Sequence, residues 1–252
     1  MYYRLNNLNE VSLSREKTEE EVKRFLSICF LSKVKSFLSE VMKNRVDKSL
    51  RIISLIVFLF LFSCSSEYYY LRRGIFNYNK GQYDEAISDF TRTLKINPNL
   101  GNVYYNRGTA YWVKGEYDNA VSDFNKALEI NPRDPDPYIS RGGVYINKDQ
   151  PDQAIADFNK ALELDPKSAE AYLNRGAAYA KKGQPDQAIA DFNKVLEINP
   201  NFGMAYYDRG RVYYLKGEYN KSWSDIKRAH DLGFQIPPEF LEDLRKASGR
   251  QN

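Results

Sequence analysis

The sequence predicts an all-α fold, a right-handed solenoid of stacked helical hairpins. The first observation is a period of 34 residues, marked by Pro98, Pro132, Pro166 and Pro200. The second is that other residue types keep this period, namely Gly74, Gly108, Gly142, Gly176 and Gly210 and also Ala86, Ala120, Ala154 and Ala188. A unit of this length cannot bury its apolar face alone, so neighbouring units must stack. The third is the composition, since 42% hydrophobic and 28% charged residues argue against disorder.

Each repeat divides into two helices, as the fourth copy shows. Its first helix, AEAYLNRGAAYAKKG, is expected to end at Gly183, a natural left-handed cap. The second begins at Pro185, ends before Pro200 and carries a stripe of apolar residues at Ala188, Ile189, Phe192 and Leu196. A glycine within a helix costs about 1 kcal/mol relative to alanine. We expect Gly176 to offset this cost by letting Ala188 approach closely.

The repeats share one order of residue types along the chain, namely an aromatic residue, Gly, Tyr, Ala, Phe, Ala and Pro. In the second repeat these are Tyr104, Gly108, Tyr111, Ala120, Phe124, Ala127 and Pro132. This pattern resembles the tetratricopeptide repeat family. The resemblance covers Glu67 to Phe234 and implies five repeats, at 67–100, 101–134, 135–168, 169–202 and 203–236. The first and last copies depart from it, with Asn77 in place of Tyr and Ile226 in place of Phe. Residues 237–252 are expected to form a capping helix and a tail, with an apolar face of Phe240, Leu241 and Leu244.

One pair of opposite charges recurs in every copy. An arginine precedes each repeat glycine and an aspartate follows sixteen residues later, giving Arg73–Asp89, Arg107–Asp123, Arg141–Asp157, Arg175–Asp191 and Arg209–Asp225. The arginines could form a basic ladder for an acidic ligand. Because the two charges are equal in number and matched in position, the sequence favours internal pairing.

Composition argues against catalysis, metal binding and nucleic-acid binding. The chain has one histidine, His230, and two cysteines, so neither a catalytic triad nor a zinc site is readily built, and no cofactor motif occurs. Residues 1–66 hold 11 basic and 7 acidic side chains, whereas residues 67–252 hold 26 of each. A neutral repeat region lacks the basic patch that phosphates require. The acidic stretch 131–138 lies at a repeat junction and is interpreted as a turn. We expect no enzyme, no cofactor and no metal.

The region before the repeats has the features of a lipoprotein signal. The run from Ile52 to Phe62 is too short for a typical membrane span and follows several basic residues, as in a signal peptide. The sequence Leu61-Phe62-Ser63-Cys64 resembles a bacterial lipobox, which implies a signal peptide at 42–63, lipidation of Cys64 and a linker at 64–66. A short uncleaved anchor is the alternative.

Residues 1–41 are a doubtful extension. We favour translation from Met42, with a cytoplasmic tail as the other interpretation.

These features predict a scaffold in the bacterial cell envelope, tethered to a membrane through Cys64 and acting in the assembly of envelope complexes. The resemblance implies a concave groove for a peptide or protein partner, which we expect to include Tyr68, Tyr78, Tyr105, Trp112, Ala177, Tyr207 and Tyr214. Aromatic walls in the second and fifth repeats would flank a floor of small residues, Gly143, Ala177 and Ala180. The alternatives are a lipoprotein that binds glycans or peptidoglycan, and a cytosolic or inner-membrane-anchored adaptor. The sequence leaves the partner and the choice of membrane open.

Overall fold

The computed structural model describes residues 66–249, and residues 67–249 belong to one compact unit. A helix at 66–79 comes first. It is followed by α5 (Tyr83–Ile96), α6 (Gly101–Val113), α7 (Tyr117–Ile130), α8 (Pro135–Asn147), α9 (Pro151–Leu164), α10 (Ala169–Lys181), α11 (Pro185–Ile198), α12 (Gly203–Leu215), α13 (Tyr219–Asp231) and α14 (Pro238–Ser248). No strand occurs between residues 66 and 249. The predicted all-α class is confirmed.

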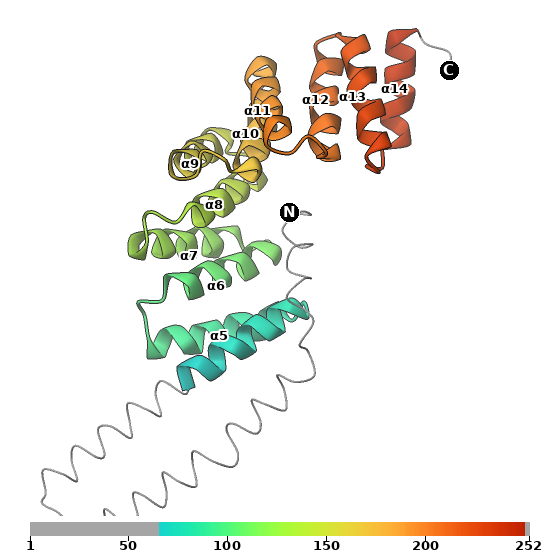
Figure 1. Ribbon diagram of the computed structural model, residues 1–252. Helices are drawn as coiled ribbons and strands as arrows, with labels where there is room; N and C mark the ends of the chain where they lie inside the picture. The colour runs from blue at the N-terminus through green and yellow to red at the C-terminus, as the bar shows by residue number, and fades with distance from the viewer. Residues whose placement is uncertain (1–65, 250–252) are drawn as a thin grey trace, which may run out of the picture. The chain divides into compact units, whose positions relative to one another are not determined.

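The helices pack as consecutive hairpins, each joined to the next (Figure 1). Within a repeat, α6 packs on α7, α8 on α9, α10 on α11 and α12 on α13. Between repeats, the second helix of one copy packs on the first helix of the next. The first helices of successive copies also touch one another, α6 with α8, α8 with α10 and α10 with α12. These first helices therefore line the inner, concave side of the solenoid.

The helix boundaries follow the local chemistry that the sequence indicates. Proline occupies the first turn of α8, α9 and α11, where its missing N–H costs nothing. Gly183 has φ of 72°, which confirms the predicted left-handed turn between α10 and α11. The equivalent position of the third repeat holds Asp149, whose φ of 59° makes it the one non-glycine residue with positive φ in the described chain. Ser168 caps α10 by accepting a hydrogen bond from the N–H of Ala171 at 3.2 Å.

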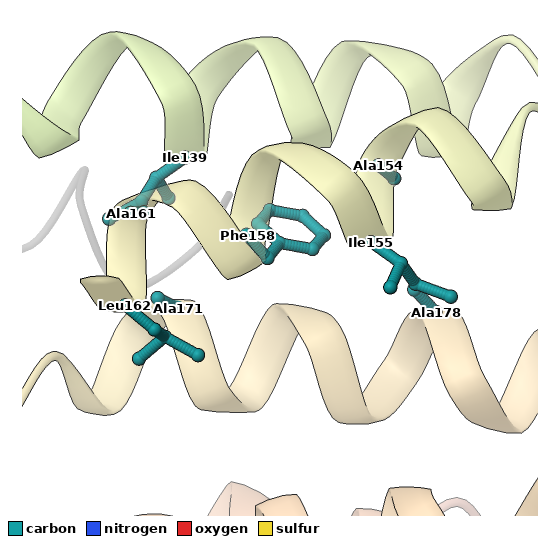
Figure 2. Packing of buried hydrophobic residues seen from close by; sticks show 8 residues of the cluster. All are labelled: Ile139, Ala154, Ile155, Phe158, Ala161, Leu162, Ala171 and Ala178. Atoms are coloured by element: carbon teal, nitrogen blue, oxygen red, sulfur yellow. The ribbon is translucent and has the colours of Figure 1, made fainter. Parts of the chain in front are cut away.

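The core repeats one arrangement, with a fully buried phenylalanine of the second helix facing the first helix. Figure 2 shows this around Phe158, with α8 above it and α10 below. A Cβ on Gly176 would lie 2.8 Å from Cε1 of Phe192, so the glycine makes room for this aromatic ring. The ring is too large to share the space with a methyl group, and this explains the glycine of the first four repeats. In the fifth repeat Ile226 replaces the ring, and its Cδ1 would lie 3.0 Å from a Cβ on Gly210. The close approach of Ala188 to Gly176 stays a prediction.

Helix α14 covers the end of the last hairpin, as predicted. Leu244 is completely buried, while Phe240 and Leu241 are half-buried. The indole N–H of Trp223 in α13 donates to Ser248 Oγ at 3.0 Å and ties the end of α14 to the fifth repeat. The capping role follows directly, because without α14 this apolar surface would face water.

The predictions for the amino-terminal region fall outside the described residues. They concern the extension at 1–41, the signal peptide at 42–63 and Cys64. Among residues 66–249, no helix combines the length and the hydrophobicity needed to cross a bilayer.

Candidate functional site

The recurring arginines and aspartates bind one another, which confirms the internal pairing. In the fourth repeat, Nε and Nη2 of Arg175 donate to the two carboxylate oxygens of Asp191 at 2.8 and 2.7 Å. The other four pairs have the same bidentate geometry. The hydrogen bond to Asp191 raises the pKa of Arg175, outweighing the opposite effect of burial. The aspartates are nearly inaccessible, so the ladder is part of the framework.

Two further contacts link each repeat to the one before it, and the sequence analysis missed both. The remaining guanidinium nitrogen of Arg175 donates to Asn159 Oδ1 of the preceding repeat at 2.6 Å, and Arg107, Arg141 and Arg209 make the matching contact with Thr91, Asn125 and Asn193. A lysine of each repeat also pairs with an aspartate thirty residues earlier, giving Lys114–Asp84, Lys148–Asp118, Lys182–Asp152 and Lys216–Asp186. The 34-residue period carries both signals. They appear only when residues of adjacent copies are compared.

The inner surface is formed by one stripe of each first helix, at spacings that place its residues on one face. In α12 this stripe is Met204, Asp208, Arg211 and Leu215, and in α10 it includes Ala177 and Lys181. Of the five large apolar side chains that are exposed in the described residues, Tyr68, Ile75 and Leu215 lie on first helices, and Ile130 and Ile198 lie on second helices. Tyr68 is 58% exposed and Leu215 74%, and Ala177 is also exposed. Together with Ile75, they are exposed apolar positions of the first helices that a partner could reach without displacing the core.

Trp112 and Tyr105 pack against the neighbouring repeat. A Cβ on Gly143 would lie 2.5 Å from Cη2 of Trp112, so the indole lies directly on this glycine. Tyr105 packs on Phe124 with ring centroids 5.8 Å apart, and its hydroxyl accepts a hydrogen bond from Ser140 at 3.3 Å. Trp112, part of the predicted aromatic wall of the second repeat, therefore covers Gly143, part of the predicted floor of small residues. The open small-residue floor is restricted to α10, around Ala177.

The indole N–H of Trp112 is buried and has no hydrogen-bond acceptor, the one such side-chain atom found among the described residues. Tyr78, another predicted groove residue, is half-buried on the cluster around Phe90 and makes an edge contact with Tyr83 at 5.5 Å. Both rings thus have their apolar faces occupied by protein.

The predicted aromatic wall of the fifth repeat is shared with the capping segment. Tyr207 stacks on Phe234 with centroids 4.9 Å apart and meets the edge of Phe240 at 5.8 Å. Tyr214 contacts Phe240 at 5.4 Å and Tyr219 at 5.9 Å. Both tyrosines are half-buried as a result. Their place in a partner groove stays a prediction, and position counting within the repeat could not show that α14 reaches them.

Asp208 is the side chain of the inner surface that the sequence analysis missed. It is 23% exposed, and within the described residues its nearest charged group is Nη1 of Arg211, 3.8 Å from Oδ1. No hydrogen bond to the carboxylate is formed in this part of the chain. Burial raises its pKa to about 6, and Arg211 opposes the shift only weakly. The one available signal was an aspartate at the position where the other repeats carry Arg72, Asn106, Ser140 and Asn174.

The remaining candidates have structural roles. Asp134 in the acidic junction caps α8, because its Oδ1 accepts a hydrogen bond from the N–H of Asp136 at 3.1 Å. Residues 66–249 contain no group of histidine, cysteine and acidic side chains that could hold a metal. His230 lies in the last turn of α13 with 77% of its side chain exposed.

Comparison with known families finds matches along the repeat region. Models described as tetratricopeptide repeat match residues 101–134 and 169–202, and a related one matches 124–156 and 192–223. A third, described as TPR repeat, matches 77–115 and 142–183. Together they cover residues 77–223 without a gap. The chain belongs to the tetratricopeptide repeat family. No curated protein matches its sequence significantly.

Solved structures of other tetratricopeptide repeat proteins are similar to this one. The MamA protein is 25% identical with a TM-score of 0.60, and the match covers 74% of this chain and 96% of MamA. YrrB is 26% identical with a TM-score of 0.57, covering 71% and 90%. YrrB is described as having an unusual peptide-binding site. PilF of Pseudomonas aeruginosa, at 19% identity and a TM-score of 0.65, covers 74% and 86% and shares the fold. The family membership makes protein–protein interaction the general role of this solenoid.

Proposed function

We propose that the protein is a non-catalytic scaffold that holds an extended segment of a partner protein on the inner surface of its repeats. The observation that carries the proposal is the position of the exposed apolar side chains. Tyr68, Ala177 and Leu215 lie on the inner stripes of the first helices and are accessible. The recurring arginines and aspartates pair with one another, so they are not available to bind a ligand. A row of accessible apolar anchors on a rigid concave surface suits a peptide chain.

Binding of a glycan through the aromatic residues is less well supported. Sugars stack on free aromatic faces, whereas Tyr207 is stacked on Phe234 and Trp112 lies on Gly143. The described peptide-binding site of YrrB, a protein of the same family, also favours a peptide partner. For these reasons the peptide scaffold is the function that the structure supports best.

We further propose that Cys64 carries a lipid and that the repeats act at the bacterial cell envelope, in assembly of a membrane-associated complex. Support comes from the sequence, in which the apolar run 52–62 ends at a lipobox-like Leu-Phe-Ser-Cys. A lipid anchor would hold the solenoid close to a membrane while leaving its inner surface open to a partner. This arrangement requires no catalytic group.

The scaffold proposal can be tested by placing a photo-crosslinking amino acid at Ala177 in the full-length chain expressed in cells. Ile198, which is 42% exposed and lies at the end of α11, is the matched control because it is on a second helix. We expect crosslinks to a protein from position 177 and few or none from position 198. Equal crosslinking from both positions, or crosslinks to glycan that peptidoglycan fragments suppress, would contradict the proposal.

A further inference from the structure

The carboxylate of Asp208 is an unusual feature of the inner surface. It lies on the stripe of α12 that carries the most exposed apolar residue, Leu215. Within the described residues it receives no hydrogen bond, and its single ionic contact is 3.8 Å long. A mostly buried carboxylate normally has several donors, because losing water without gaining a donor is unfavourable. The Asp208 carboxylate can therefore still pair with a cation or accept a hydrogen bond.

Arg211 does not supply this missing partner. Its guanidinium carbon lies 5.7 Å from the centroid of the Tyr207 ring, so the group is placed over the ring as much as toward the carboxylate. More than half of its side chain remains exposed, at 56%. By contrast, Arg209 in the same helix binds Asp225 through two hydrogen bonds of 2.7 Å. The helix thus contains one fully formed arginine–aspartate pair and one loose pair on its inner face.

The fold does not require an acid at this position. The four equivalent residues are Arg72, Asn106, Ser140 and Asn174. Ser140 shows where the position points, since its hydroxyl contacts Tyr105 in the first helix of the preceding repeat. Gly143, one turn later, contacts Trp112 of that same helix. Because the repeats are equivalent, we expect Asp208 to lie opposite Leu173 of α10 and Arg211 opposite Ala180, one helical turn to either side of Ala177.

These observations define a subsite. The small, exposed side chain of Ala177 forms its floor, and the carboxylate of Asp208 places one loosely paired negative charge at its edge. The described part of the chain is close to neutral overall, so the charge is local. A basic side chain crossing Ala177 could reach the carboxylate while its methylene groups lie on the alanine surface. Arginine fits best, because its planar guanidinium can donate two hydrogen bonds to one carboxylate.

We propose that Asp208 is the specificity-determining residue of the inner groove and binds a basic side chain, preferably arginine, of the extended partner segment. This inference rests on the proposed function. In the free protein Arg211 only partly neutralises Asp208, and the partner's guanidinium completes the pair. The helices packed on α12 are α10, α11, α13 and α14, and none of their charged groups affects the pKa of Asp208, so among the described residues Arg211 is the single competitor.

The test uses fluorescent octapeptide pools in which one central residue is fixed as arginine, norleucine or glutamate and the others vary. Binding to the full-length chain in mild detergent is followed by anisotropy at pH 7.5 and low salt. We expect the arginine pool to bind about tenfold more tightly than the norleucine pool, as one charge-assisted pair provides. Asp208→Asn should reduce the preference to about twofold or less and leave the norleucine pool unaffected. Asp186→Asn, which removes an exposed carboxylate of α11, should keep the preference.

The outcomes separate the two proposals. If the pools bind without a preference for arginine, or if the preference survives Asp208→Asn, the inference about Asp208 is wrong and the groove stands. If no pool binds to the parent chain, the peptide groove itself is wrong, and the inference falls with it. A repeat at pH 5 gives an independent check. Protonation of Asp208 should weaken the preference in the parent chain and change nothing in Asp208→Asn.

Discussion

Replacing Asp208 with asparagine should stabilise the protein, and the gain should grow with pH. Asparagine has nearly the shape of a protonated aspartate, so the variant removes the charge and little else. The folded state raises the pKa of Asp208 from the ordinary value of 3.8 to about 6, because the buried carboxylate has lost water. A carboxyl group whose pKa is raised on folding binds its proton more tightly in the folded state. The parent chain therefore loses stability as the pH rises from about 4 through about 6.

The size of the effect follows from the two pKa values. One pKa unit is equivalent to about 1.4 kcal/mol, so a rise from 3.8 to about 6 lowers the free energy of unfolding by about 3 kcal/mol at pH 8. At pH 4 the folded protein is protonated and much of the unfolded ensemble is too, which leaves a difference of about 0.5 kcal/mol. The side chain keeps some contact with water, so about 3 kcal/mol is the upper end of the expected gain.

The assay is urea unfolding of the full-length parent and variant chains at several values between pH 4 and pH 8, followed by far-ultraviolet circular dichroism. The difference between the two chains isolates Asp208, because every other titrating group is common to both. Asp186→Asn provides the control, since Asp186 is exposed and paired with Lys216. A difference that stays flat across this pH range would refute the desolvated carboxylate. So would a variant less stable than the parent at pH 8.

Three further predictions test the framework and the anchor. Arg175→Ala should lower the free energy of unfolding by about 1–3 kcal/mol, because Asp191 loses its donors. Adding Asp191→Asn should cost less than the sum in a double-mutant cycle, and strict additivity would contradict the pairing. Gly142→Ala should destabilise, since its Cβ would lie 2.6 Å from the Phe158 ring. Overpacking of about 1–3 kcal/mol exceeds the gain of about 1 kcal/mol in helix propensity, and an unchanged urea midpoint would contradict this. Cys64→Ala should abolish palmitate labelling in a Gram-negative host, and persistent label would exclude lipidation at this residue.

Most of the fold could be predicted from the sequence because each repeat is fixed by local and nearest-neighbour contacts. Proline and glycine set the helix ends through backbone chemistry, as Pro185 and Gly183 show. The internal pairing of arginine and aspartate also followed, since equal numbers at a fixed offset leave few other arrangements. The contact between Gly176 and Phe192 was not predicted. Spacing shows that the two helices approach there, but only coordinates show that the phenylalanine ring fills the gap.

The inner surface was harder to predict because it depends on contacts between copies and on the chain ends. Position counting predicted Tyr214 and Trp112 as groove residues. It could not show that Phe240 reaches Tyr214 or that Trp112 lies on Gly143. The first contact joins the fifth repeat to α14, and the second joins the second repeat to the third. The residues involved lie at variable positions of the repeat, so the 34-residue period gives no signal from which to infer these contacts.

The two least satisfied polar groups of the inner surface are located where the repeat pattern gives no reason for them. Trp112 has a buried N–H without an acceptor, and Asp208 has a carboxylate without a hydrogen-bond donor, both among the described residues. The recurring arginines, by contrast, each form two hydrogen bonds with an aspartate. Groups that break such a regular pattern are expected at functional or strained sites. Asp208 is the more informative of the two, because its oxygens are still partly accessible and a neutral residue serves at three of the four equivalent positions. The stability gained by Asp208→Asn and the loss of arginine preference should therefore occur together in one variant.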